Sequence, residues 1–175
     1  TKRALSVSGM AQQTFDLYQR VTSLPAGKRI FSLLYAVKAP YFATVRPQVR
    51  EVRANHGELS IRNRKRVHNH IGTLHAIAVC NGLEAAMGLL AEASVPAGRR
   101  WIPIGMDVRY LAKASTDLAC LAETDPEERN LFATEMYAWK LKAWARLAGC
   151  YEEIDWAITP RIAESYGKFS DPDLA

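Results

Sequence analysis

The sequence predicts an α+β domain in which a sheet wraps around one long apolar helix. Apolar residues recur at helical spacing in the first part of the chain and alternate with polar residues in most later segments. One stretch, from Thr73 to about Glu92, is apolar on nearly all sides, which is typical of a helix enclosed by other elements. The 175 residues suffice for one domain with a substantial core.

Two helices are expected before the sheet. Apolar residues from Met10 to Leu24 recur at near-helical spacing, and the run ends at Pro25-Ala26-Gly27. A shorter helix is expected from Lys28 to Val37, with Pro40 preventing its continuation.

The period then changes to that of strands. Tyr41–Arg53 alternates apolar and polar residues, and Glu58–Arg66 places Leu59 and Ile61 on one face. Four further strands are expected at Trp101–Leu111, Thr116–Glu123, Trp139–Leu147 and Tyr151–Ile162.

The connections between these elements carry turn signals. Thr73 is expected near the N-cap of the long helix, and Pro96-Ala97-Gly98 at its exit. The last two strands are expected to form a hairpin that turns at Gly149, and Pro126–Ala133 is a helical turn or a loop. The chain therefore divides into a helical extension packed on the domain (1–40), the main domain (41–163) and a loose tail (164–175).

The charge is unevenly distributed along the chain. Residues 1–70 hold 13 Lys+Arg against 3 Asp+Glu, whereas residues 71–175 hold 10 against 15. The basic run Arg62-Asn63-Arg64-Lys65-Arg66 is either a solvated strand and loop or a rim that faces phosphates. Few aromatic residues interleave with these arginines, which disfavours a platform for single-stranded nucleic acid, and we expect no nucleic-acid partner.

Cysteine usage and hydropathy indicate a cytoplasmic protein. Cys80, Cys120 and Cys150 show no metal-ligand spacing and leave one thiol over, which favours a reducing compartment. The richest apolar run, 76–91, is interrupted by polar residues and glycines, so no membrane span is expected. The N-terminal residues lack the apolar core of a signal peptide.

Three segments resemble a known superfamily. They are Lys38-Ala39-Pro40-Tyr41-Phe42, Asn69-His70-Ile71-Gly72-Thr73-Leu74-His75-Ala76-Ile77-Ala78 and Asn81-Gly82-Leu83-Glu84-Ala85-Ala86-Met87-Gly88. With the order of elements, they resemble hotdog-fold thioesterases related to those of phenylacetate degradation, and within that group an uncharacterised family of the DUF4442 type. The resemblance covers about residues 10 to 162 and implies a hotdog fold, an antiparallel sheet wrapped around a central helix.

The resemblance also implies the site of an acyl-CoA thioesterase. Asn69, Gly72 and His75 belong to the shared pattern, and the backbone N–H of Ala76 is the implied oxyanion donor. Related thioesterases usually have two glycines after the histidine, where this chain has Ala76 and Ile77. N–H groups at a helix start lack intrahelical partners, so they can polarise a thioester carbonyl.

Glu84 is the candidate base or nucleophile, because burial in an apolar helix would raise its pKa toward a useful range. Asn81, Arg64, Lys65 and Arg66 are candidate substrate contacts. Coenzyme A is expected only as part of the substrate, with no separate cofactor and no metal.

Helical spacing adds a prediction about assembly. His75 and Glu84 are nine residues apart, which at roughly 100° per residue places them on opposite faces of one helix. Two helices of a symmetric dimer could present both groups to one substrate. We therefore expect a homodimer, or a dimer of dimers, with a composite site.

Simpler interpretations of the same residues remain open. Glu84 could be a structural ion-pair partner, His75 could orient the loop, and Asn69 could serve only its turn. A metal cluster of His68, His70 and His75 is disfavoured because no carboxylate or cysteine joins them at ligand spacing, and Cys80 as a nucleophile because no base is placed beside it. A non-catalytic hotdog protein that binds an acyl ligand is the alternative function, and a dehydratase would require a differently placed acid.

Overall fold

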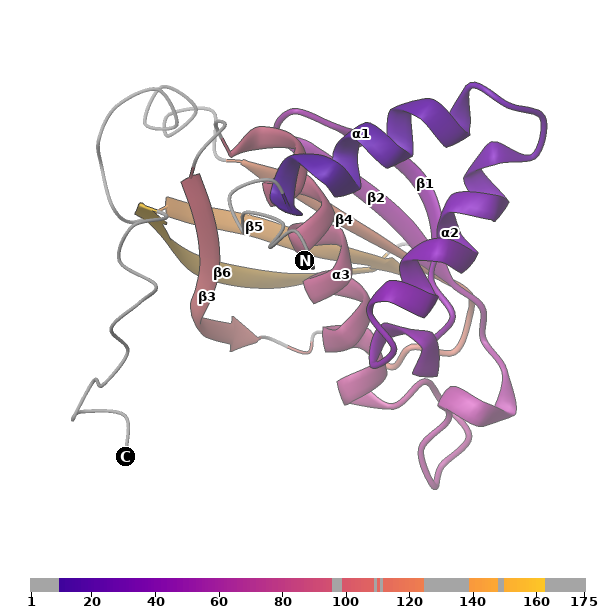
Figure 1. The fold of residues 1–175 in the computed structure, drawn as a ribbon. Helices are drawn as coiled ribbons and strands as arrows, with labels where there is room; N and C mark the ends of the chain where they lie inside the picture. Colours follow the sequence, from indigo (N-terminus) through magenta and orange to yellow (C-terminus); the bar gives the residue numbers. More distant parts are fainter. Residues whose placement is uncertain are drawn as a thin grey trace.

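The computed structural model describes residues 10–95, 99–108, 110, 112–124, 139–147 and 150–162. Two N-terminal helices precede a sheet that curves around a third, central helix (Figure 1). The helices are α1 (Met10–Thr22), α2 (Gly27–Lys38) and α3 (Ala76–Ser94), with short 3₁₀ helices η2 (Phe42–Thr44) and η3 (Lys65–Val67). The strands are β1 (Gln48–Arg53), β2 (His56–Ile61), β3 (Arg99–Val108), β4 (Leu118–Thr124), β5 (Trp139–Leu147) and β6 (Cys150–Ile162).

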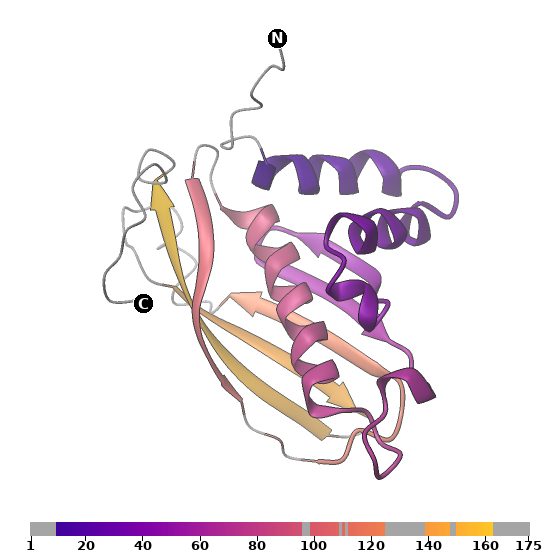
Figure 2. The same ribbon diagram turned by 60° about the horizontal axis from the view of Figure 1, so that its bottom comes forward.

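The six strands form one sheet in the order β1-β2-β4-β5-β6-β3. Every neighbouring pair is antiparallel. The sheet bends around α3, as Figure 2 shows. The predicted α+β architecture, a sheet wrapped around a long helix with helices before it, is therefore confirmed.

Helix α3 is buried along almost its whole length. Residues 78–83 and 85–91 are all buried, and two glycines lie where it packs on the sheet. A Cβ added at Gly57 in β2 would lie 2.3 Å from the Ala86 carbonyl oxygen, and one at Gly82 would lie 2.4 Å from Cδ1 of Ile61. A side chain at Gly57 would push α3 off the sheet, whereas one at Gly82 would first displace the side chains of Ile61 and Cys120. By length and composition α3 could also cross a membrane, but it is the core helix of this fold.

The N-terminal helices close the β1 edge of the sheet. The Tyr18 hydroxyl accepts a hydrogen bond from the Val52 N–H at 3.1 Å, and Ser32 Oγ accepts one from the Val49 N–H at 2.9 Å. These contacts occupy N–H groups of an edge strand that would otherwise be open to pairing. Figure 2 shows both helices at the β1–β2 end of the sheet, with β3 at the opposite edge.

One predicted strand was wrong in its first half. Tyr41–Arg53 was expected to be extended, but Phe42–Thr44 is a 3₁₀ helix in which the Ala43 N–H donates to the Pro40 carbonyl at 3.1 Å. Arg46 has a φ of 50°, and strand β1 starts only at Gln48, after Pro47. Alternation alone could not detect this turn, because Val45 and Pro47 are buried in it as they would be in a strand.

Other boundaries also moved. The strand expected at Glu58–Arg66 ends at Ile61 because the basic run turns into η3, and the strand expected at Trp101–Leu111 ends at Val108. The two N-terminal helices and the last two strands lie where they were predicted. The expectations for 96–98, 126–133, Gly149 and 164–175 fall outside the described residues.

Candidate active site

The loop before α3 is held together by the side chain of Asn69. Its Oδ1 accepts hydrogen bonds from the N–H groups of Ile71 and Thr73, both at 3.1 Å. Its Nδ2 donates to Thr73 Oγ1 at 2.8 Å and to the Leu74 carbonyl at 3.5 Å. These four contacts use the full capacity of the amide. Asn69 therefore shapes the loop, and the Thr73 hydroxyl is engaged here and does not cap the helix.

Gly72 completes the same turn. Its N–H donates to the Asn69 carbonyl at 3.2 Å, and its φ is 82°. Only glycine adopts this left-handed conformation without strain, although there is open space for a side chain. The requirement for glycine in the shared pattern is thus explained by the backbone alone.

His75, and not Thr73, is the N-cap of α3. Its Nδ1 accepts a hydrogen bond from the Ile77 N–H at 3.1 Å, and its carbonyl accepts from the Ala78 N–H at 2.8 Å. Because Nδ1 is an acceptor, the neutral ring carries its proton on Nε2. The ring is exposed, so this Nε2–H is accessible from solvent at the start of α3.

The capping leaves one N–H open at the start of α3. The N–H groups of Leu74 and His75 donate to the carbonyls of Ala114 and Val67, and those of Ile77 and Ala78 are bound by His75. Among the described residues, nothing accepts a hydrogen bond from Ala76. As the first residue of the helix it lacks an intrahelical acceptor and lies at the positive end of the helix dipole. An open N–H at this place can donate a hydrogen bond to an anion.

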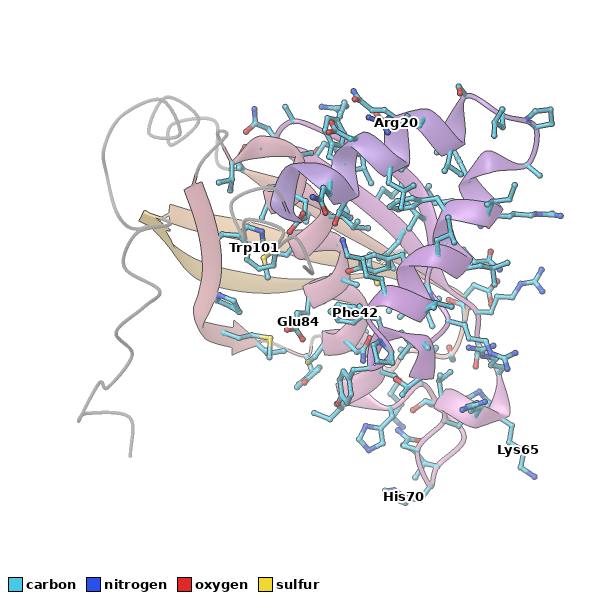
Figure 3. The ribbon with its side chains drawn as sticks, viewed as in Figure 1. Arg20, Phe42, Lys65, His70, Glu84 and Trp101 are labelled. Carbon is cyan, nitrogen blue, oxygen red and sulfur yellow. The ribbon has the colours of Figure 1, made fainter. Side chains whose placement is uncertain are left out.

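Glu84 is the one residue of α3 between Ala78 and Ala91 that is not buried. It is half-buried, and burial raises its pKa. The described residues form no hydrogen bond or ion pair with it, so it is not a structural ion-pair partner within this part of the chain. Figure 3 shows Glu84 on α3, and its charge, after burial and the charge of Glu92, helps to raise the pKa of Tyr35 in α2.

Ile77 and Cys80 lie two turns and one turn before Glu84 on α3. Ile77 lies on the same face of α3 as Glu84 and is 55% exposed. Cys80, one turn from Glu84, contacts the Tyr110 hydroxyl at 3.0 Å, and Tyr110 and Met106 are themselves exposed. Glu84 is thus an acid whose charged form is disfavoured by burial, on the one part of the central helix that is not fully enclosed.

The predicted substrate contacts differ in accessibility. Asn81 is 4% exposed, and its Nδ2 lies 3.5 Å from Thr44 Oγ1 beneath η2. Arg64 is half-buried and donates to the Val45 carbonyl at 2.8 Å, and burial with its neighbouring arginines lowers its pKa. Lys65 and Arg66 are exposed on η3. Figure 3 shows Lys65 at the same end of the molecule as His70 in the loop before α3.

The three histidines considered as metal ligands have separate environments. His68 Nε2 contacts Asn63 Oδ1, His75 caps α3, and His70 is exposed. A different group, Glu51, His56 and Glu58, brings ligand atoms within 4.8 Å of one another on β1 and β2. There Glu51 is paired with Arg53 at 2.8 Å and His56 Nδ1 with Glu123 Oε1 at 3.1 Å, so two of the three residues already have a protein partner.

Sequence reasoning missed a second acid in α3. Glu92 accepts a hydrogen bond from the Trp101 indole N–H at 3.2 Å, and its other oxygen is buried without a partner in the described residues. Burial raises the pKa of Glu92 to about 7, although Trp101, Thr14 and Lys38 favour the charged form. The same signal that singled out Glu84, an acid in an apolar helix, would have found it.

Comparison with known proteins identifies the family. Residues 27–147 match the domain of unknown function DUF4442, so the chain belongs to this family. It is similar to a structural-genomics protein, APC5556, with 35% identity, a TM-score of 0.72 and coverage of 87% of this chain and 98% of that one. No curated protein matches the chain.

More distant structures define the fold. A Pseudomonas aeruginosa protein named a probable thioesterase aligns with a TM-score of 0.67 at 20% identity, covering 79% of this chain and 97% of that one. A thioesterase family protein from Silicibacter pomeroyi aligns with a TM-score of 0.61 at 18% identity, covering 75% and 96%. The protein therefore has the hotdog fold, as the sequence predicted.

The environment of Glu92 predicts a pH-dependent stability. Its pKa in the folded protein, about 7, exceeds the ordinary value of 4.5, so folding favours the protonated form. The wild type should lose stability as pH rises from 4.5 to 7, by an amount on the order of 2–3 kcal/mol. Glu92→Gln cannot ionise, so its melting temperature relative to the wild type should be several degrees higher at pH 8 than at pH 5. An equal difference at both pH values would contradict this account.

Proposed function

We propose that this protein is an acyl-CoA thioesterase whose active site is shared between two subunits of a homodimer. One observation carries the proposal: α3 combines an open N–H at Ala76 with a half-buried acid, Glu84, that has no partner in the described residues. A polarising donor and a base are the two groups that thioester hydrolysis requires. Between them Ile77 is exposed and residues 78–83 are buried.

The reaction follows from these two groups. The thioester carbonyl oxygen accepts a hydrogen bond from Ala76 N–H, with the Nε2–H of His75 as a second donor. Glu84 takes a proton from water as the water oxygen attacks the carbonyl carbon. The C–S bond then breaks, and the proton passes from Glu84 to the leaving thiolate, giving a carboxylic acid and a thiol. The raised pKa of Glu84 suits a group that first accepts and then returns a proton.

The length of α3 supports a composite site. Ala76 and Glu84 are eight residues apart, which is about 12 Å along a helix axis. A glutamate side chain cannot span that distance to meet a carbonyl held at Ala76. A second subunit that presents its own Glu84 would complete the site.

The free edge of the sheet offers a place for that subunit. Strand β3 is an edge strand, and among the described strands it pairs only with β6. Unlike β1, it carries no described helix side chain on its outer N–H groups. Pairing of β3 with its copy across a two-fold axis would cover both this edge and the exposed Met106.

Coenzyme A is the proposed carrier because cations flank the loop before α3. Lys65 and Arg66 are exposed at that end of the molecule and can meet phosphates, whereas Arg64 is committed to the Val45 carbonyl. The names of the Pseudomonas and Silicibacter proteins agree with a thioesterase. An acyl-CoA substrate also suits the expected cytoplasmic location.

Glu84→Gln tests the base. It retains the volume of the side chain but cannot accept the proton, so kcat against a panel of acyl-CoA esters should fall roughly a hundredfold or more. The melting temperature should change little, because no described cation depends on Glu84. Glu84→Asp should retain part of the activity.

The matched control is Glu92→Gln on the same helix, which should keep wild-type turnover at a pH where both proteins are folded. A Glu84→Gln variant that hydrolyses esters at the wild-type rate would end the catalytic assignment. A wild type that binds acyl-CoA without turnover would instead indicate the non-catalytic acyl-binding alternative.

The double variant Lys65→Ala/Arg66→Ala tests the carrier. If these cations meet the phosphates of coenzyme A, KM should rise severalfold while kcat is nearly unchanged, and the difference from the wild type should shrink as salt is added. Arg20→Ala removes one exposed cation on α1, at the opposite end of the molecule from Lys65 (Figure 3), and serves as the control. Identical KM values for the double variant and the wild type would mean that the basic run 62–66 is only a solvated loop.

A further inference from the structure

Helix α2 exposes an apolar stripe to solvent. Ile30, Leu33, Leu34 and Val37 follow the spacing of one helical face, and they are 41%, 69%, 41% and 80% exposed. The opposite face of α2, with Phe31 and Tyr35, is buried. Leu24 and Tyr41, just beyond the two ends of the helix, are also mostly exposed. Single exposed apolar residues are ordinary, but a stripe of this length marks a binding surface.

The stripe lies within a part of the chain that has no acid. From residue 17 to residue 50 the sequence contains no Asp or Glu. It contains six cations, namely Arg20, Lys28, Arg29, Lys38, Arg46 and Arg50. Apolar residues bordered by cations on one helix are the pattern of surfaces that lie in the interface of an anionic membrane.

A groove beside the stripe concentrates these cations. It has a volume of about 1000 Å³ and runs between α2, the segment after η2, and β1. Leu33 and Val37 of the stripe form part of its wall, and no Asp or Glu lines it. Its charged lining consists of Lys28, Arg29, Arg46, Arg50, Arg62 and Arg64.

We propose that the outer face of α2 docks on the surface of anionic phospholipid membranes. Ile30, Leu33, Leu34 and Val37 would enter the region between headgroups and acyl chains, as the apolar face of an interfacial helix does. The groove cations would meet lipid phosphates beside them. The face lies at the β1 side of the sheet, away from the β3 edge, so this docking does not depend on the proposed hydrolase activity.

The charges of this face favour an anionic membrane over a second copy of the chain as its partner. A two-fold contact through this face would bring Lys28, Arg29 and Arg46 against the same cations of the partner, and no acid of this segment could compensate them. An anionic lipid surface is complementary to the same arrangement. The apolar stripe and the cations then contribute together.

Sedimentation with vesicles tests the proposal. The full chain should co-sediment with vesicles of phosphatidylglycerol and phosphatidylcholine in equal parts, and at least about tenfold less with phosphatidylcholine alone. Leu33→Ser/Val37→Ser, which leaves the charge unchanged, should lower binding to the mixed vesicles about tenfold. Lys28→Ala/Arg29→Ala should also lower it and weaken its salt dependence, whereas Lys113→Ala should bind as the wild type does.

All of these substitutions are at exposed positions, so circular dichroism should show folded proteins. A wild type that stays in the supernatant with the mixed vesicles would overturn the proposal, as would a Leu33→Ser/Val37→Ser variant that binds as tightly as the wild type. A stripe variant that instead lowers the oligomeric mass in light scattering, with vesicle binding unchanged, would assign the face to self-association.

Discussion

The close contact between α3 and strand β2 is the constraint on which the fold and the candidate site depend. Gly57 allows the helix to approach the sheet to a distance that a side chain would prevent, because its Cβ would meet the Ala86 carbonyl oxygen, and Gly82 leaves room for the side chains of Ile61 and Cys120. The sheet can then curve around α3 and bury residues 78–83 and 85–91. A helix enclosed in this way has only its first turn and one open face available for chemistry, and Ala76 and Glu84 lie there.

The hydrogen bonds at the first turn of α3 explain why one N–H there is left open. The amide of Asn69 and the left-handed backbone of Gly72 hold the loop in shape. The Nδ1 and carbonyl of His75 accept hydrogen bonds from the N–H groups of Ile77 and Ala78. What these contacts leave open is the N–H of Ala76. A backbone donor does not require glycine, so the departure from the usual glycine pair is compatible with this role.

Periodicity was sufficient to predict the helices and the wrapped sheet, because burial of α3 imposes an apolar pattern on the chain. It failed at residues 42–47, where a turn between two prolines buries alternate residues just as a strand does. Periodicity also could not identify the N-cap of α3. Asn69 forms a hydrogen bond with the Thr73 hydroxyl, so His75 binds the first-turn N–H instead. The α2 stripe was missed because exposure depends on packing with distant elements, whereas the signal that singled out Glu84 could also have found Glu92.

Complementation between two inactive variants tests the composite site most directly. Ala76→Pro removes the open N–H, while proline is tolerated at the first helical position after the extended His75. Each of Ala76→Pro and Glu84→Gln alone should be nearly inactive. Co-expressed, half of the dimers are mixed and one of their two sites is intact, so activity should return to about one quarter of the wild-type value. A mixture as inactive as its components would contradict a site shared between subunits.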